Sequence, residues 1–62
     1  MTFEEFHNGL RILLNIDQDE FEAGVDDSSW PVFRNDPHRW FIQASDKAAQ
    51  RLWALMQARM RP

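Results

Sequence analysis

The sequence predicts an all-α fold, a small single domain that spans residues 1–62. Apolar residues recur at helical spacing near both ends of the chain, and residues that favour helix N-caps precede most of the helical segments. The one β-prone stretch, 40–43, has no second strand to pair with. We therefore expect two longer helices packed with short helical segments and an extended, aromatic-rich connection.

The first longer helix is expected over 3–15. Thr2, with Glu5 three residues later, forms a capping box, and acidic residues suit the positive end of the helix dipole. Ile12 falls opposite the apolar face, as either a lone exposed side chain or an interface contact. The residues of the apolar face are Phe3, Phe6, Leu10, Leu13 and Leu14.

A short helix is expected over 18–23, followed by a turn over 25–29. Asp17 is a suitable N-cap, and its spacing to Glu20 repeats the capping pattern. Gly24 is placed to cap the C-terminus, since glycine adopts the left-handed conformation freely.

Two prolines organise the middle of the chain. Pro31 and Pro37 each suit the first turn of a helix, which predicts a short helix near 31–35 and a turn near 37–40. We expect the extended connection 40–43 to follow, buried against the helices.

The last helix is expected over 46–60, with Ser45 as its N-cap. Its inward face comprises Ala49, Leu52, Trp53, Met56 and Met60. The core is predicted to join the first and last helices through Phe6, Leu10, Leu13, Leu14, Leu52, Trp53 and Met56.

The composition favours a cytoplasmic protein. The chain has no cysteine, which excludes disulfides and thiolate metal sites. Acidic residues stand near the N-terminus, where a targeting segment carries basic ones, and no apolar run is long enough to span a membrane. We expect no membrane association.

Charge is divided unequally along the chain. Residues 1–31 contain eight acidic residues and one arginine, whereas residues 32–62 contain six basic and two acidic residues. Opposite net charges attract, so we expect acidic 17–27 to face basic 47–61. If the two segments belong to different copies, the contact makes a homodimer, which we predict. The alternative is that the same contact forms within one chain.

The sequence does not favour an enzyme or a cofactor. It has no cysteine, no tyrosine and no glycine-rich phosphate loop. The candidate acid–base groups are His7 and His38, and neither belongs to a zinc-protease or EF-hand pattern. We therefore expect no catalytic or metal site. The alternative is a metal site formed by both histidines together with Asp36 or Asp46.

A basic face of the last helix is the one feature that suits nucleic acid. Lys47, Arg51 and Arg59 lie on one side, with Leu55 between them. Phosphates would relieve the repulsion between these cations, and so would the acidic residues of 17–27. The sequence pI of about 5.1 is low for nucleic-acid binding, which therefore ranks as the alternative function.

The segment 30–41 contains four aromatic residues, two prolines and two arginines. This composition is typical of interaction hot spots, although the pattern favours a core position for the aromatic side chains and a surface position for Arg34 and Arg39. The expected function is a non-enzymatic protein–protein interaction module whose partner is another protein or a second copy. Its candidate interface residues are Ile12, Arg34, Arg39, Lys47, Arg51, Leu55 and Arg59.

Three stretches carry a resemblance to other proteins: FEEFHNGLRILLNID at 3–17, DPHRWFI at 36–42 and RLWAL at 51–55. Over nearly its full length, the chain resembles a group of short, uncharacterised proteins of bacteria and their phages. The resemblance implies a bacterial or prophage setting. The group has no assigned activity or site residues, so no mechanism follows from it.

Overall fold

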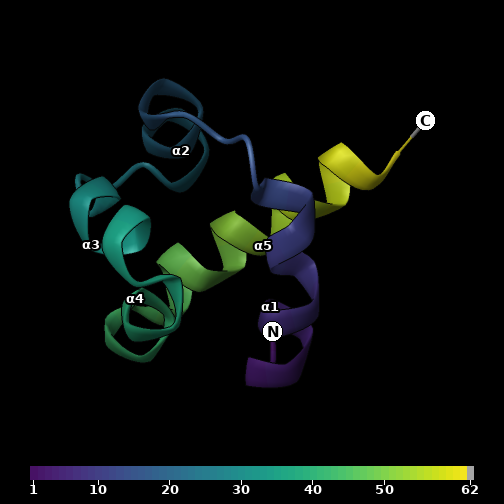
Figure 1. Ribbon diagram of the computed structural model, residues 1–62, viewed down its shortest axis with the longest axis horizontal. Coiled ribbons are helices and arrows are strands. Elements are labelled where there is room, and N and C mark those ends of the chain that lie inside the picture. Colours follow the sequence, from purple (N-terminus) through teal and green to yellow (C-terminus); the bar gives the residue numbers. More distant parts are fainter. Residues whose placement is uncertain (62) are drawn as a thin grey trace.

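The all-α prediction is confirmed by a computed structural model that describes residues 1–61. Those residues form five α-helices and one 3₁₀ helix, with no strand among them (Figure 1). In chain order the elements are α1 (Phe3–Gly9), η1 (Leu10–Leu13), α2 (Gln18–Val25), α3 (Trp30–Asn35), α4 (Pro37–Gln43) and α5 (Asp46–Met60).

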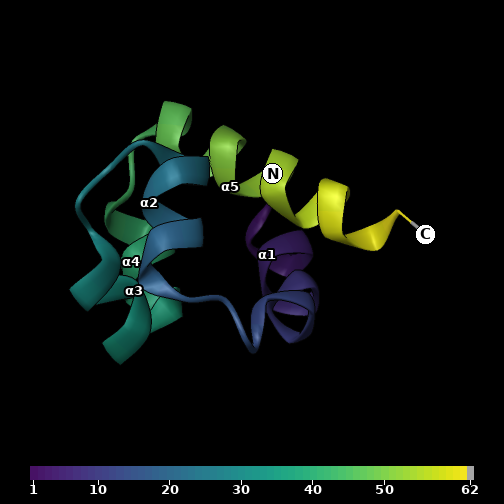
Figure 2. The same cartoon turned by 90° about the horizontal axis from the view of Figure 1, so that it is seen from above.

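The long helix α5 forms one side of the molecule, and the shorter elements pack on it. Helix α2 runs beside α5, and η1 also contacts α5. Helices α3 and α4 pack against each other on one side, while α1 and η1 lie on the other, as seen in two perpendicular views (Figures 1 and 2), and α1 also contacts α4. This arrangement leaves η1 and α3 facing each other across the front of the molecule.

The predicted N-caps are confirmed. The backbone N–H of Glu5 donates to the Thr2 hydroxyl at 3.1 Å, and Glu5 accepts in return from the Thr2 backbone. Asp17 accepts from the N–H of Glu20 at 2.8 Å, and Ser45 accepts from the backbone of the last helix at 3.1 Å. These caps fix where three of the helices begin.

The predicted first helix, 3–15, is wrong after Gly9. From Leu10 the chain continues as the 3₁₀ helix η1, which turns about 120° per residue instead of ~100°. Leu10 and Leu13 therefore share one inward face, while Leu14 is rotated by roughly 80° from its α-helical direction. Leu14 is 79% exposed, so its assignment to the core is wrong.

Helix α2 is longer than predicted, and Gly24 is not its cap. The helix continues to Val25, which is buried, so the turn begins after it. Asp26 adopts the left-handed conformation at the helix end, with φ 59°. Aspartate tolerates this conformation better than most residues, and the two further helical residues include the buried Val25.

Residues 37–43 form the helix α4, so both the turn predicted near 37–40 and the extended connection at 40–43 are wrong. Asp36 caps the helix by accepting from the N–H of Arg39 at 3.2 Å, and Pro37 occupies the first turn. Helix formation turns Trp40 into the core, where it is 2% exposed. Tertiary burial thus outweighs the local β propensity.

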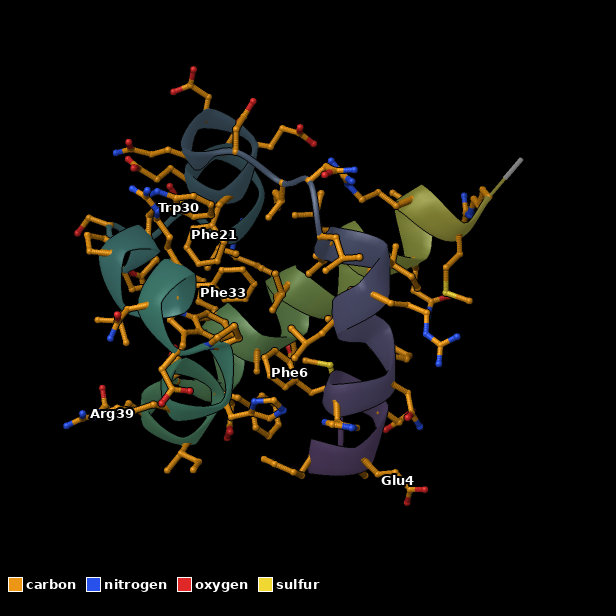
Figure 3. The ribbon with its side chains drawn as sticks, viewed as in Figure 1. Glu4, Phe6, Phe21, Trp30, Phe33 and Arg39 are labelled. Carbon is orange, nitrogen blue, oxygen red and sulfur yellow. The ribbon has the colours of Figure 1, made fainter. Side chains whose placement is uncertain are left out.

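The core is rich in aromatic contacts, as the sequence indicated. Phe33 packs against Phe21 with ring centroids 4.8 Å apart and meets Trp40 edge-on at 5.6 Å (Figure 3). The buried residues are Phe6, Leu13, Ile16, Phe21, Val25, Phe33, Trp40, Ala48, Leu52 and Met56.

The inward face of α5 differs in part from its prediction. Leu52 and Met56 are fully buried, whereas Met60 is 60% exposed. Trp53, like Leu10 on the facing element, is only half-buried against the core. The buried face of α5 therefore consists of Ala48, Leu52 and Met56.

Candidate interaction surface

An apolar groove of about 420 Å³ lies between η1 and α3, and we call it the Leu14 groove. Leu14 is the most exposed large apolar side chain of residues 1–61, because the 3₁₀ helix turns it away from the core. The groove is lined by Leu10, Leu13, Leu14, Ile16, Trp30, Phe33, Arg34 and Pro37.

The wall of the groove formed by α3 is held in place by aromatic packing. Trp30 stacks on Phe33 with ring centroids 6.0 Å apart and also contacts Phe21 at 5.4 Å (Figure 3). Phe21 is fully buried and Trp30 only half-buried. The core therefore supports an aromatic side chain that still presents surface to the groove.

Arg34 gives the groove a positive charge. It is exposed in the last turn of α3 and lines the groove beside the apolar residues. The only ion pair within residues 1–61 joins Arg59 to Glu20, so no carboxylate in this range neutralises Arg34. A ligand carboxylate can therefore pair with this guanidinium without breaking an existing ion pair.

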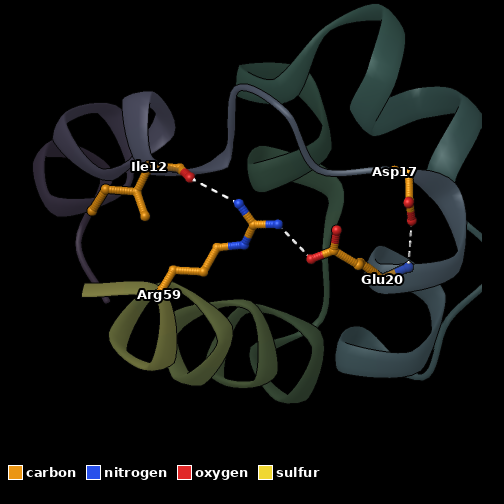
Figure 4. A network of polar contacts seen from close by, with 4 residues as sticks. All are labelled: Ile12, Asp17, Glu20 and Arg59. Atoms are coloured by element: carbon orange, nitrogen blue, oxygen red, sulfur yellow. Dashed lines mark hydrogen bonds and ion pairs between the residues drawn. The ribbon is translucent and has the colours of Figure 1, made fainter. Parts of the chain in front are cut away.

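Arg59 is engaged within the chain and does not belong to the groove. Its guanidinium donates to the Glu20 carboxylate and, at 3.3 Å, to the carbonyl oxygen of Ile12 (Figure 4). Ile12 is half-buried rather than free on the outer face of its helix. Two candidate interface residues are thus joined to each other in a contact between η1 and α5.

Two other basic residues on this side of α5 lie beside the acidic residues that follow α2. Lys47 and Arg51 line a depression of about 90 Å³ with Asp26 and Asp27. The acidic segment 17–27 and the basic segment 47–61 therefore meet within one chain. This intramolecular contact is the alternative to the predicted homodimer.

Leu55 packs against α2 rather than standing free as an interface contact. It is half-buried, and a Cβ built on Gly24 would lie only 3.1 Å from its side chain. The absence of a Cβ at Gly24 lets α2 and α5 approach this closely.

Arg39 lies on a different face from Arg34. Its side chain points outward from α4 in Figure 3, beside a shallow depression that also involves Val32 and Gln43. The structure thus separates the two arginines of the aromatic segment. Only Arg34 lines the Leu14 groove.

A second apolar groove, of about 460 Å³, lies where the start of α1 meets α4 and α5. Its exposed apolar side chains are Phe3 and Ile42, which are 50% and 74% exposed. Asp46 provides its charged edge. We call it the Ile42 groove.

His7 and His38 come together although they are far apart in the sequence. Nδ1 of His7 lies 3.0 Å from Nε2 of His38, so one ring donates a hydrogen bond to the other, and the tautomers decide which ring is the donor. Within residues 1–61 no three histidine or carboxylate side chains converge as a metal site, so neither Asp36 nor Asp46 completes the predicted set.

The chain matches no protein-family model, no curated protein and no solved structure. Among residues 1–61, no helix combines the length and the apolar character that crossing a membrane requires. The residue that sequence reasoning missed is Leu14, whose exposure depends on the switch from α-helix to 3₁₀ helix at Leu10.

Proposed function

We propose that the protein is a non-enzymatic protein–protein interaction module of the bacterial or prophage cytoplasm. The observation that supports this proposal is the Leu14 groove, where an exposed leucine and a half-buried tryptophan converge with an arginine that forms no ion pair within residues 1–61. Tryptophan and arginine dominate interaction hot spots, because each combines a large contact area with a directional polar group.

The Leu14 groove suits a partner better than the Ile42 groove does. It contains Trp30 and Arg34 on one wall, whereas the Ile42 groove has neither residue type. The α3 wall is also anchored by the core through Phe33. A preorganised wall lowers the entropy lost on binding.

The chemistry of the groove defines the expected partner. Apolar side chains of a partner segment would cover Leu14 and Trp30, and a nearby carboxylate would pair with Arg34. We therefore propose an acidic, apolar segment of another protein as the occupant.

Selection from a displayed library of random peptides tests this proposal. The selected peptides are expected to combine large apolar residues with Asp or Glu. Leu14→Ser should abolish their binding and leave the fold intact, because Leu14 is 79% exposed. Arg34→Glu should shift the selection toward basic peptides.

Ile42→Ser is the matched control, since it removes a similarly exposed apolar side chain from the other groove. This variant should bind the selected peptides as the unmodified protein does. Equal binding by the Leu14→Ser variant, or loss of binding in the Ile42→Ser variant, would contradict the proposal.

Two further measurements address the alternative partners. Titration of labelled duplex and single-stranded DNA at low salt tests the basic face of α5; salt-sensitive binding that Arg51→Glu weakens would favour the nucleic-acid function.

Sedimentation equilibrium tests a second copy as the occupant. A dimer that Leu14→Ser dissociates would identify the partner as the protein itself.

A further inference from the structure

We propose that His7 and His38 form a binding site for one divalent transition-metal ion, such as Zn²⁺ or Ni²⁺. The two imidazoles come from α1 and α4 and approach each other through Nδ1 of His7 and Nε2 of His38. Water molecules would complete the coordination shell.

The separation of the two nitrogens suits a shared ion. Imidazole nitrogens bind Zn²⁺ at about 2.0–2.1 Å, so two ligands on one ion lie roughly 2.8–3.4 Å apart for angles between a right angle and the tetrahedral angle. The observed 3.0 Å lies within this interval. An ion shared by both nitrogens lies off the line that joins them, so each ring must rotate from its hydrogen-bonded direction to point at the ion. The ring that donates the hydrogen bond must also carry its proton on its other nitrogen, which leaves both facing nitrogens free to bind the ion.

Aromatic neighbours fix the ring of His38. Phe6 meets it edge-on with ring centroids 6.0 Å apart, and the ring of Phe3 lies 5.5 Å away, tilted by 40°. Phe6 is fully buried, so the core positions this ligand. His7 is exposed and His38 half-buried, which leaves the paired nitrogens open to an ion from solvent.

The ligand types determine which ions bind. Two neutral imidazoles favour Zn²⁺, Ni²⁺ and Cu²⁺, whereas Mg²⁺ and Ca²⁺ prefer oxygen ligands. These are the only two histidines of the chain, which also lacks cysteine. Any metal binding that needs two imidazoles of one chain must therefore use this pair.

Calorimetric titration of the untagged protein with ZnCl₂ and with NiCl₂ at neutral pH tests the site. One ion per chain is expected, and binding should be lost at a pH where the imidazoles are protonated, because a metal ligand must be neutral. His7→Ala and His38→Ala should each weaken binding by about tenfold or more, since removing even a group that supports a ligand costs ~10–100-fold.

Asn8→Ala is the control, because Asn8 is exposed beside His7 and should not alter the affinity. NMR spectra of the unmodified protein provide a second readout that needs no variant. Zn²⁺ should shift the imidazole resonances of both histidines together, and MgCl₂ should shift neither. Metal binding that persists in both histidine variants would overturn the proposal. So would an NMR titration in which Zn²⁺ shifts the resonances of only one imidazole.

Discussion

Arg59 connects three parts of the chain through one guanidinium, which binds Glu20 of α2 and the carbonyl oxygen of Ile12 in η1 (Figure 4). The side chain of Arg59 is 27% exposed and that of Glu20 is 45% exposed. Solvent therefore screens the ion pair in part, and its contribution is expected to be modest.

A double-mutant cycle on Arg59→Ala and Glu20→Ala measures this contribution. We expect a coupling free energy of about 0.2–1 kcal/mol in urea unfolding, which should fall as salt is added. Arg59→Ala alone should cost more than Glu20→Ala alone, because it also removes the hydrogen bond to Ile12. Arg61→Ala, just beyond the end of α5, is the control and should leave stability unchanged.

The capping box of α1 predicts a dependence of helix stability on pH. The pKa of Glu5 is lowered by the hydrogen bond from the Thr2 backbone and then by that from the Thr2 hydroxyl. A lowered pKa in the folded state stabilises the fold fully above the ordinary pKa of glutamate, and this stabilisation is lost as the pH falls through the lowered value. Titration of the Glu5 carboxyl by NMR should show the lowered pKa.

Thr2→Ala should raise the pKa of Glu5 toward its ordinary value, because the hydroxyl contribution disappears. Thr2→Ser retains a hydroxyl and should preserve most of the shift. An unchanged pKa in the Thr2→Ala variant would show that the hydroxyl has no role in the shift.

Gly9→Ala should destabilise the protein, although alanine favours helices. A Cβ at this position would lie 2.7 Å from the sulfur of Met56, whose side chain is fully buried. Overpacking of this kind typically costs ~1–3 kcal/mol. The cost in urea unfolding should shrink when Gly9→Ala is combined with Met56→Val, which shortens the opposing side chain; an additive effect would contradict the steric explanation.

Truncation of two leucines should have very different effects on the free energy of unfolding. Leu52→Ala is expected to cost ~2–5 kcal/mol, because Leu52 is fully buried beneath the shorter helices. Leu14→Ala should change stability by no more than about 0.5 kcal/mol, as is usual for surface substitutions. Urea unfolding of both variants separates the two positions, and a large cost at Leu14 would place it in the core after all.

The sequence predicted where three of the helices begin better than it predicted helix α4. The caps Thr2, Asp17 and Ser45 are local signals, since each satisfies a backbone N–H three residues away. Helix α4 depends instead on a long-range contact, the burial of Trp40 against Phe6 and Phe33. Its local signal Pro37 also suits a turn, and the β-prone residues 40–43 favour an extended connection after it.

The candidate surface was only partly predictable. Arg34 was expected at the surface from its residue type, and the structure places it in the Leu14 groove. Leu14 could not be assigned, because its direction depends on where the α-helix becomes a 3₁₀ helix. That position coincides with the close packing of Gly9 on Met56, which is a tertiary contact.

Ser29 should stabilise the core through Trp40. Its hydroxyl does not cap α3 but accepts a hydrogen bond from the indole N–H of Trp40 at 2.6 Å. Ser29→Ala leaves that buried donor unsatisfied, which we expect to cost about 1–3 kcal/mol in urea unfolding. Ser28→Ala is the matched control, since Ser28 is exposed and should tolerate the same change.

In a Trp40→Phe background Ser29→Ala should cost much less, because no N–H remains to be satisfied. An equal cost in both backgrounds would show that Ser29 acts at the start of α3 and not through Trp40.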